Sequence, residues 1–90
     1  MSRPPLYITM HAADNVAIVA NDGGLPAGTG FADGLVLVDA VPQGHKVALV
    51  DLAEGDAVRR YNVVIGYANR AMPRGSWVNE KTLRMPAAPG

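Results

Sequence analysis

A four-residue pattern that recurs four times restricts the fold of this chain more than any other feature: an apolar residue, then Pro or Ala, any residue, and Gly. The copies occupy residues 25–28, 41–44, 52–55 and 72–75. Pro in the second place has the fixed φ that a type I turn needs, and the closing Gly easily adopts a left-handed conformation. The glycines are unevenly spaced, which excludes a solenoid of fixed period. The pattern therefore predicts four similar corners in a compact, irregular β domain.

Short segments rich in β-branched and aromatic residues separate the corners. We expect strands at residues 6–10, 15–20, 35–38, 47–50, 58–61, 63–68 and 77–78. Alternation along residues 45–50 would place the odd-numbered side chains on one face of a strand and the even-numbered ones on the other. Only residues 79–83 have the composition of a helical turn, which Asn79 could cap. The predicted fold class is mainly β, with Pro/Gly corners and little helix.

Size and composition narrow the possible partners. Ninety residues form one small domain, which we place at residues 1–84, with residues 85–90 as the start of a Pro/Ala-rich linker. The formal net charge of +0 argues against a nucleic-acid partner. No apolar run is long enough to span a membrane and the N-terminus lacks a signal peptide, so we expect a cytoplasmic protein without a membrane partner. The linker indicates either a domain of a longer chain or a subunit that docks onto another.

Positive charge is concentrated towards the C-terminus. From residue 57 onward the chain has six Lys or Arg side chains and a single acidic one, Glu80. Such a basic half could meet an anionic ligand or an acidic partner surface, or could be a solvated face. The chain has no cysteine, so a metal ion could be bound only by His and carboxylate side chains.

The turn at residues 41–44 delivers two titratable side chains, His45 and Lys46, onto the start of an apolar strand. His45 could serve as a metal ligand or as an acid or base, and Lys46 as a carboxylate anchor or, when desolvated, as a base. The alternatives are a structural histidine whose hydrogen bonds are satisfied and a solvated lysine at a sheet edge. Trp77 is expected to pack in the core or at a domain interface.

A second polar cluster, His11 with Asp14 and Asn15, lies between the first two expected strands. It could bind a divalent metal or orient a substrate hydroxyl; the alternative is an Asx turn that satisfies local backbone amides. If His11 came close to His45, two histidines and a carboxylate could form a facial set for non-haem iron. Arg60 could hold a substrate carboxylate through two hydrogen bonds, or could be a packing stem with a solvated head.

Four segments together, residues 11–18, 41–49, 60–68 and 72–77, resemble the N-terminal domain of the galactarate and altronate dehydratase family. The resemblance covers nearly the whole chain and implies an SAF-type β-clip fold. It also implies a role in dehydrating a sugar acid such as galactarate to a 5-keto-4-deoxy or 2-keto-3-deoxy acid, with a divalent metal, usually iron. One departure is Asn62, where the family commonly has Gly; Asn tolerates left-handed geometry, so a tight turn could persist there. The long second portion of the family, which carries most of its catalytic apparatus, is absent from these residues.

For this chain the resemblance implies an accessory domain that lines or closes the active site of a larger, metal-dependent hydro-lyase. The candidate residues are His45 and Lys46 in catalysis, Asp14, Asn15 and Arg60 in substrate binding, and His11 as a metal ligand. The remainder of the dehydratase chain, or its large subunit, would supply most of the ligands of the iron and would largely recognise which sugar acid is bound. The alternatives are a non-catalytic sugar-acid binding module, a structural domain that mediates homodimerisation, and a separate small subunit of an altronate-type dehydratase. We expect the 90 residues alone to be inactive.

Overall fold

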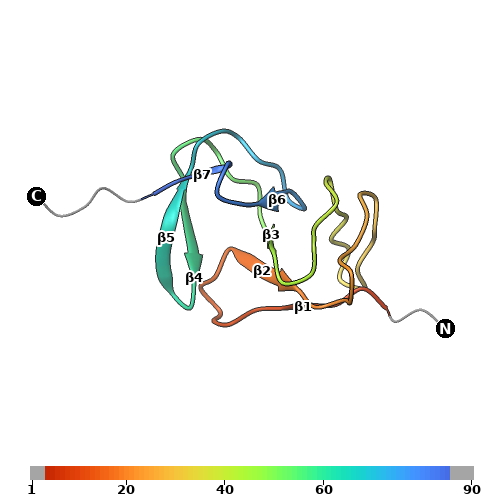
Figure 1. Ribbon diagram of the computed structural model, residues 1–90. Helices are drawn as coiled ribbons and strands as arrows, with labels where there is room; N and C mark the ends of the chain where they lie inside the picture. The colour runs from red at the N-terminus through yellow and green to blue at the C-terminus, as the bar shows by residue number, and fades with distance from the viewer. Residues whose placement is uncertain (1–3, 86–90) are drawn as a thin grey trace, which may run out of the picture.

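The computed structural model describes residues 4–85 of the protein as an all-β fold of two antiparallel sheets (Figure 1). The strands are β1 (Tyr7–Ile8), β2 (Val16–Val19), β3 (Lys46–Ala48), β4 (Ala57–Arg60), β5 (Val63–Ala68), β6 (Trp77–Val78) and β7 (Leu83–Arg84). One sheet has the order β1-β2-β3-β6 and the other β4-β5-β7. Residues 4–85 contain no helix, which confirms the predicted fold class. In this described part, accordingly, there is no helix long and apolar enough to cross a membrane.

Two predicted elements are absent from the structure, the ends of four predicted strands shift by one or two residues, and β7 was not predicted. Residues 35–38 are extended, with alternating buried and exposed side chains, but they form only an isolated bridge, between Val36 and Gly30, and no strand. Residues 79–83 do not form a helical turn: a single turn closes with a 3.0 Å hydrogen bond from the Thr82 amide to the Asn79 carbonyl, and Leu83 then enters β7. Pairing of β7 with β5 supplies the backbone partners that a longer helix would have supplied itself. The predicted linker lies outside the described residues, apart from Met85.

The four corners share one conformation, and their glycines are left-handed as predicted. The φ values at the four closing glycines, Gly28, Gly44, Gly55 and Gly75, are 87°, 79°, 90° and 93°. In the second corner the His45 amide donates to the Pro42 carbonyl at 3.1 Å, and the other three corners close in the same way. Proline or alanine is therefore the first residue of each turn and Gly the third. The predicted turns are wrong in two respects: each turn begins one residue later than predicted, and its type is II rather than I, because a positive φ at the third residue belongs to a type II turn.

The corners are joined in pairs, and we call each pair a clasp. In the first clasp Leu25 and Val41 exchange two backbone hydrogen bonds of 2.9 Å. In the second, Leu52 and Met72 exchange two of 2.7 Å. The sequence pattern thus marks the two halves of one repeated arrangement, although its spacing is uneven.

Strands β2, β3 and β6 lie between two small hydrophobic cores. Val47 of β3 packs with Val19 and Leu35 in one core, whereas its neighbour Ala48 packs with Val16 and Val58 in the other. All are buried. This arrangement confirms the predicted alternation of faces along residues 45–50. The same strands therefore contribute side chains to both cores.

Candidate functional site

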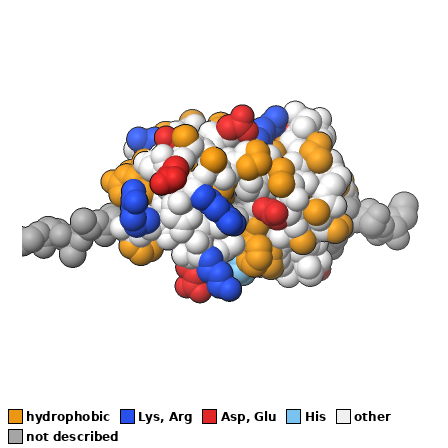
Figure 2. Space-filling model, turned by 90° about the horizontal axis from the view of Figure 1, so that it is seen from above, with side chains coloured by type: hydrophobic (Ala, Val, Ile, Leu, Met, Phe, Trp, Pro, Cys, Tyr) orange, Lys and Arg blue, Asp and Glu red, His pale blue; other side chains and the backbone are white. Residues whose placement is uncertain are grey.

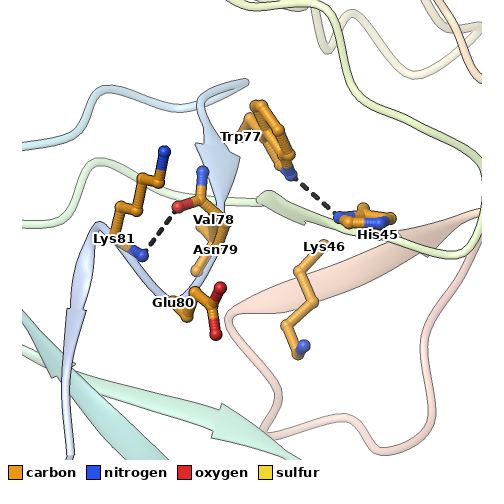
Figure 3. A pocket seen from close by; sticks show the side chains of 7 residues that line it. All are labelled: His45, Lys46, Trp77, Val78, Asn79, Glu80 and Lys81. Atoms are coloured by element: carbon orange, nitrogen blue, oxygen red, sulfur yellow. Dashed lines mark hydrogen bonds between the residues drawn. The ribbon is translucent and has the colours of Figure 1, made fainter.

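The candidate site is a hollow of about 550 Å³ beside β6 (Figure 3). Antiparallel pairing of β3 with β6 sets Lys46 opposite Val78 and Val47 opposite Trp77. This register brings the residues that precede β3 next to those that follow β6. The polar and aromatic side chains that line the hollow are those of His45, Lys46, Trp77, Asn79, Glu80 and Lys81.

His45 is held at the mouth of the hollow by the second corner. Its amide closes that turn, and its carbonyl accepts a 3.0 Å hydrogen bond from the Val19 amide at the end of β2. The imidazole is exposed, and its Nδ1 accepts a 3.2 Å hydrogen bond from the indole Nε1–H of Trp77. The two rings meet edge to face, with centroids 5.6 Å apart and planes at 61°. His45 is thus anchored at its backbone and at one ring nitrogen.

Trp77 packs partly against the core that contains Val47, as predicted, and also forms a wall of the hollow. Its backbone amide donates a 3.0 Å hydrogen bond to Asp39 Oδ2. The indole is therefore fixed by its strand, by the core and by a side chain from a separate loop.

Two ammonium groups and one carboxylate give the hollow a net positive charge. Lys46 is half-buried, whereas Glu80 and Lys81 are exposed. Glu80 and Lys81 lie in a single turn, in which the Lys81 amide donates a 2.8 Å hydrogen bond to Asn79 Oδ1. Asn79 therefore caps this turn, as it was predicted to cap a helical one. In Figure 3 Lys46 and Lys81 lie on opposite sides of the hollow. An anion with oxygens at both ends is a suitable ligand for such a pair.

The rest of the basic half is not gathered into one patch on the face shown in Figure 2. Lys and Arg side chains there are interspersed with acidic and hydrophobic ones. The positive hollow is therefore a local feature, built by the β3–β6 register.

Asp14 supports the turn of the β4–β5 hairpin. Its two carboxylate oxygens accept hydrogen bonds of 2.8 Å and 3.0 Å from the amides of Asn62 and Tyr61. Both of these residues are left-handed, with φ of 58°, so the tight turn persists without glycine. Partial burial would raise the pKa of the Asp14 carboxyl, but the hydrogen bonds from Asn62 and Tyr61, helped by the amides of Met10 and His11, outweigh it and lower that pKa.

Asn15 fastens the same hairpin to the other sheet. Its Nδ2 donates to the Ala57 carbonyl at 2.8 Å, and its Oδ1 accepts from the Arg59 amide at 2.7 Å. The Asn15 side chain therefore makes the pair of hydrogen bonds to the β4 backbone that a neighbouring strand would make. Substrate-binding roles for Asp14 and Asn15 stay predictions, and in this structure both side chains bond to backbone groups of the β4–β5 hairpin. The predicted alternative, capture of backbone amides, is met at Asp14 mainly by the amides of Asn62 and Tyr61, which are distant in sequence, and to a smaller extent by the nearby amides of Met10 and His11.

His11 and Arg60 lie apart from the hollow. The exposed His11 accepts a 3.0 Å bond from the Ala13 amide at Nδ1, in the loop before β2, whereas His45 contacts the far end of β2. The Arg60 guanidinium lies 5.6 Å from the centroid of the Tyr61 ring, and its buried Nε has no hydrogen-bond partner among the described residues. Within residues 4–85 no group of three His, Cys, Asp or Glu side chains could hold a metal ion. The described residues therefore do not fit a metal site, and a ligand role for His11 stays a prediction.

Sequence reasoning missed Asn79, Glu80 and Lys81 as lining residues. They were predicted only as a helical turn, and nothing in their composition indicates a site. The corner pattern gives no signal for them, because all four corners are alike and nothing in it shows that the strand after the second corner pairs with the strand after the fourth.

Comparison with known families decides which family the chain represents. Residues 5–86 match the family described as the altronate/galactarate dehydratase SAF domain. The chain belongs to this family. The SAF domain is 57% identical over 83 residues to the galactarate dehydratase (L-threo-forming) of Escherichia coli strain K12, and 38% identical over 81 residues to the altronate dehydratase of the same strain. These matches cover 92% and 87% of the SAF domain but only 16% of each dehydratase.

A third relative is shorter. The SAF domain is 45% identical over 49 residues to the (2R)-sulfolactate sulfo-lyase subunit alpha of Chromohalobacter salexigens. Those residues are 51% of this chain and 52% of that subunit.

Proposed function

We propose that the SAF domain works as part of a sugar-acid dehydratase, in which its hollow closes over the active site and contacts the hydroxy-acid anion. The observation that carries this proposal is that Lys46, Lys81 and the Trp77-bound His45 line one hollow. Two cations can neutralise carboxylates, and an imidazole anchored at one nitrogen can direct the other towards a substrate oxygen. The hollow is within the size range of small-molecule sites.

The names of the relatives support a carboxylate ligand. Galactarate, altronate and sulfolactate are all 2-hydroxy carboxylates, and a dehydratase or a sulfo-lyase eliminates a group from such an acid. Elimination next to a carboxylate places negative charge on that carboxylate in the transition state, and fixed positive charge stabilises it. Lys46 and Lys81 would supply this charge from the SAF domain.

The divalent metal that the resemblance implies would be held by the larger part of the enzyme. The described residues offer no set of three ligands for it, and no step of the proposal passes through it. Recognition of the particular sugar acid would also come largely from that part, because the candidate acids differ in hydroxyl stereochemistry.

A specific observation favours a second arrangement, in which the chain is a separate small subunit. The sulfo-lyase relative is itself named as a subunit, and the match covers 52% of it, against 16% of each dehydratase. Sequencing the coding region beyond Gly90 distinguishes the two: an in-frame continuation indicates a fused domain, and a stop codon indicates a subunit.

Substitutions in the complete dehydratase test the proposal. His45→Ala and Lys46→Ala should each lower kcat/KM by about 100-fold or more, with the loss expressed in kcat. The matched control is Arg59→Ala, which removes an exposed positive charge on β4, outside the hollow, and should leave kcat/KM unchanged. A rise in KM alone would indicate a binding module, and a change in assembly alone a structural domain; either result would contradict an active-site role.

A further inference from the structure

The indole of Trp77 determines which nitrogen of His45 carries the proton. Trp77 Nε1 lies 3.2 Å from His45 Nδ1. An indole nitrogen can only donate a hydrogen bond, so Nδ1 must be the acceptor and must hold a lone pair rather than a proton. The proton of the neutral imidazole then resides on Nε2.

The donor is held in place from several sides. The Trp77 amide is bonded to Asp39 Oδ2, its backbone pairs with Val47, and its ring packs against a core. His45 is fixed in turn, since its amide and carbonyl bond to the backbone of Pro42 and Val19. The hydrogen bond between the rings therefore joins two side chains whose backbones are both anchored.

We propose that Trp77 is a positioning residue that keeps His45 as the neutral Nε2–H tautomer, so that His45 acts as a hydrogen-bond donor to an oxygen of the hydroxy-acid anion. In this form the imidazole has no lone pair to offer, because Nδ1 accepts from the indole and Nε2 is protonated. His45 can then neither take a proton nor ligate a metal ion without losing the bond to Trp77. The tautomer stands on the geometry alone, whereas the role of His45 as a donor to the hydroxy-acid anion rests on the proposed function.

In this assignment the two lysines and His45 have different roles in the hollow. Lys46 and Lys81 provide charge without strong direction, since an ammonium group on a flexible stem can donate in several directions. His45 provides one directed donor and no charge. A directed donor selects the position of one substrate oxygen, which charge alone does not do.

Nitrogen NMR of the imidazoles in the 90-residue protein tests the tautomer without any substrate. At a pH where both histidines are neutral, His45 should show an unprotonated Nδ1 and a protonated Nε2. In Trp77→Phe, which keeps an aromatic ring but removes the donor, the two nitrogen shifts of His45 should move towards each other as the tautomers mix. His11 is the internal control, because its Nδ1 accepts from the Ala13 amide and should not respond. A protonated Nδ1 in the unsubstituted protein, or unchanged shifts in Trp77→Phe, would overturn the proposal.

A second variant covers the case in which Trp77→Phe does not fold. In His45→Ala, which changes only an exposed side chain, the indole N–H resonance of Trp77 should shift because its acceptor is gone. An indole resonance that stays in place would show that the bond does not form, and would overturn the proposal.

Activity of the complete dehydratase tests the donor role. Gln can place an N–H group near the position of Nε2, so His45→Gln should recover at least about tenfold in kcat/KM over His45→Ala. Trp77→Phe should lower kcat/KM in the unsubstituted enzyme but have no further effect in the His45→Ala background. A His45→Gln enzyme as impaired as His45→Ala, or additive losses in the double variant, would contradict the proposal. If His45→Ala had no effect, the proposed function would fail at His45, and the NMR result would still decide the role of Trp77.

Discussion

Gly75 and Gly44 occupy equivalent places in two corners but have very different surroundings. Both are left-handed, with φ of 93° and 79°. A Cβ atom on Gly75 would collide with the carbonyl oxygen of Val36, whereas one on Gly44 would meet nothing within 4 Å. The carbonyl of Gly75 also accepts a 3.0 Å hydrogen bond from the Val38 amide, so the two segments cannot separate without losing it. The requirement for glycine is conformational at Gly44 and both conformational and steric at Gly75.

Alanine at these two positions should separate the two requirements. Gly44→Ala should lower the free energy of unfolding by about 1–2 kcal/mol, the cost of a left-handed non-glycine residue. Gly75→Ala should lower it by more than about 3 kcal/mol, because backbone must also move to make room. Chemical denaturation of both variants provides the measurement. Equal losses would contradict the steric part, and an unchanged Gly44→Ala protein would contradict the left-handed assignment.

Among the elements, the β4–β5 hairpin depends most on side chains from elsewhere. Asp14 bonds to two amides of its turn and Asn15 to two backbone groups of β4. Neither residue belongs to a strand, yet together they join the hairpin to the sheet that contains β2. The hairpin should therefore respond to the charge of Asp14.

Because the pKa of Asp14 is lowered in the folded protein, the direction in which stability changes with pH can be predicted. Above the pKa of the unfolded chain the ionised carboxylate contributes its full stabilisation, and this is lost as pH falls through the lower folded pKa. The stability difference between the unsubstituted protein and Asp14→Asn should therefore shrink as pH falls from about 5 towards 2. Denaturation at several pH values checks this, with Asp22→Asn as a control for an exposed aspartate. A difference that is constant with pH would rule out the carboxylate as the cause.

The sequence predicted elements best where local chemistry decides them. The left-handed glycines and strands 63–68 and 77–78 follow from residue type and alternation, and the structure has them. Residues 35–38 were wrong because their backbone partners are loop residues and Gly75 rather than a neighbouring strand. At the site, the charged pair His45 and Lys46 was visible directly after a Gly. The hollow itself was not, because it depends on the pairing of β3 with β6, which are distant in the sequence.

On the scale of the whole molecule, the described residues form a packed fold beside an open hollow. Two cores and two sheets account for the described residues, but the hollow beside β6 is open and those residues hold no set of metal ligands. A dehydratase must both remove a proton next to a carboxylate and expel a hydroxyl. The side chains of the hollow suit binding and orientation better than either of these steps.

The purified 90-residue protein should therefore show no turnover of galactarate in the presence of ferrous iron. Addition of the larger part of the dehydratase should restore activity, and the His45→Ala protein in the same mixture should restore much less. Product formation measured with each component alone and with both together provides the test. Robust turnover by the 90-residue protein alone would refute the division of labour proposed for the two parts.

The two clasps also have a consequence for the order in which the chain folds. Each clasp joins residues from one short stretch, Leu25 with Val41 and Leu52 with Met72, so its loop closes at low entropic cost. The contact of Gly75 with residues 36–38 instead links the end of the second half to the first. Because local contacts form faster than distant ones, the first clasp can close while the second half is still being synthesised. Arrival of Gly75 would then lock a first half that has already taken shape.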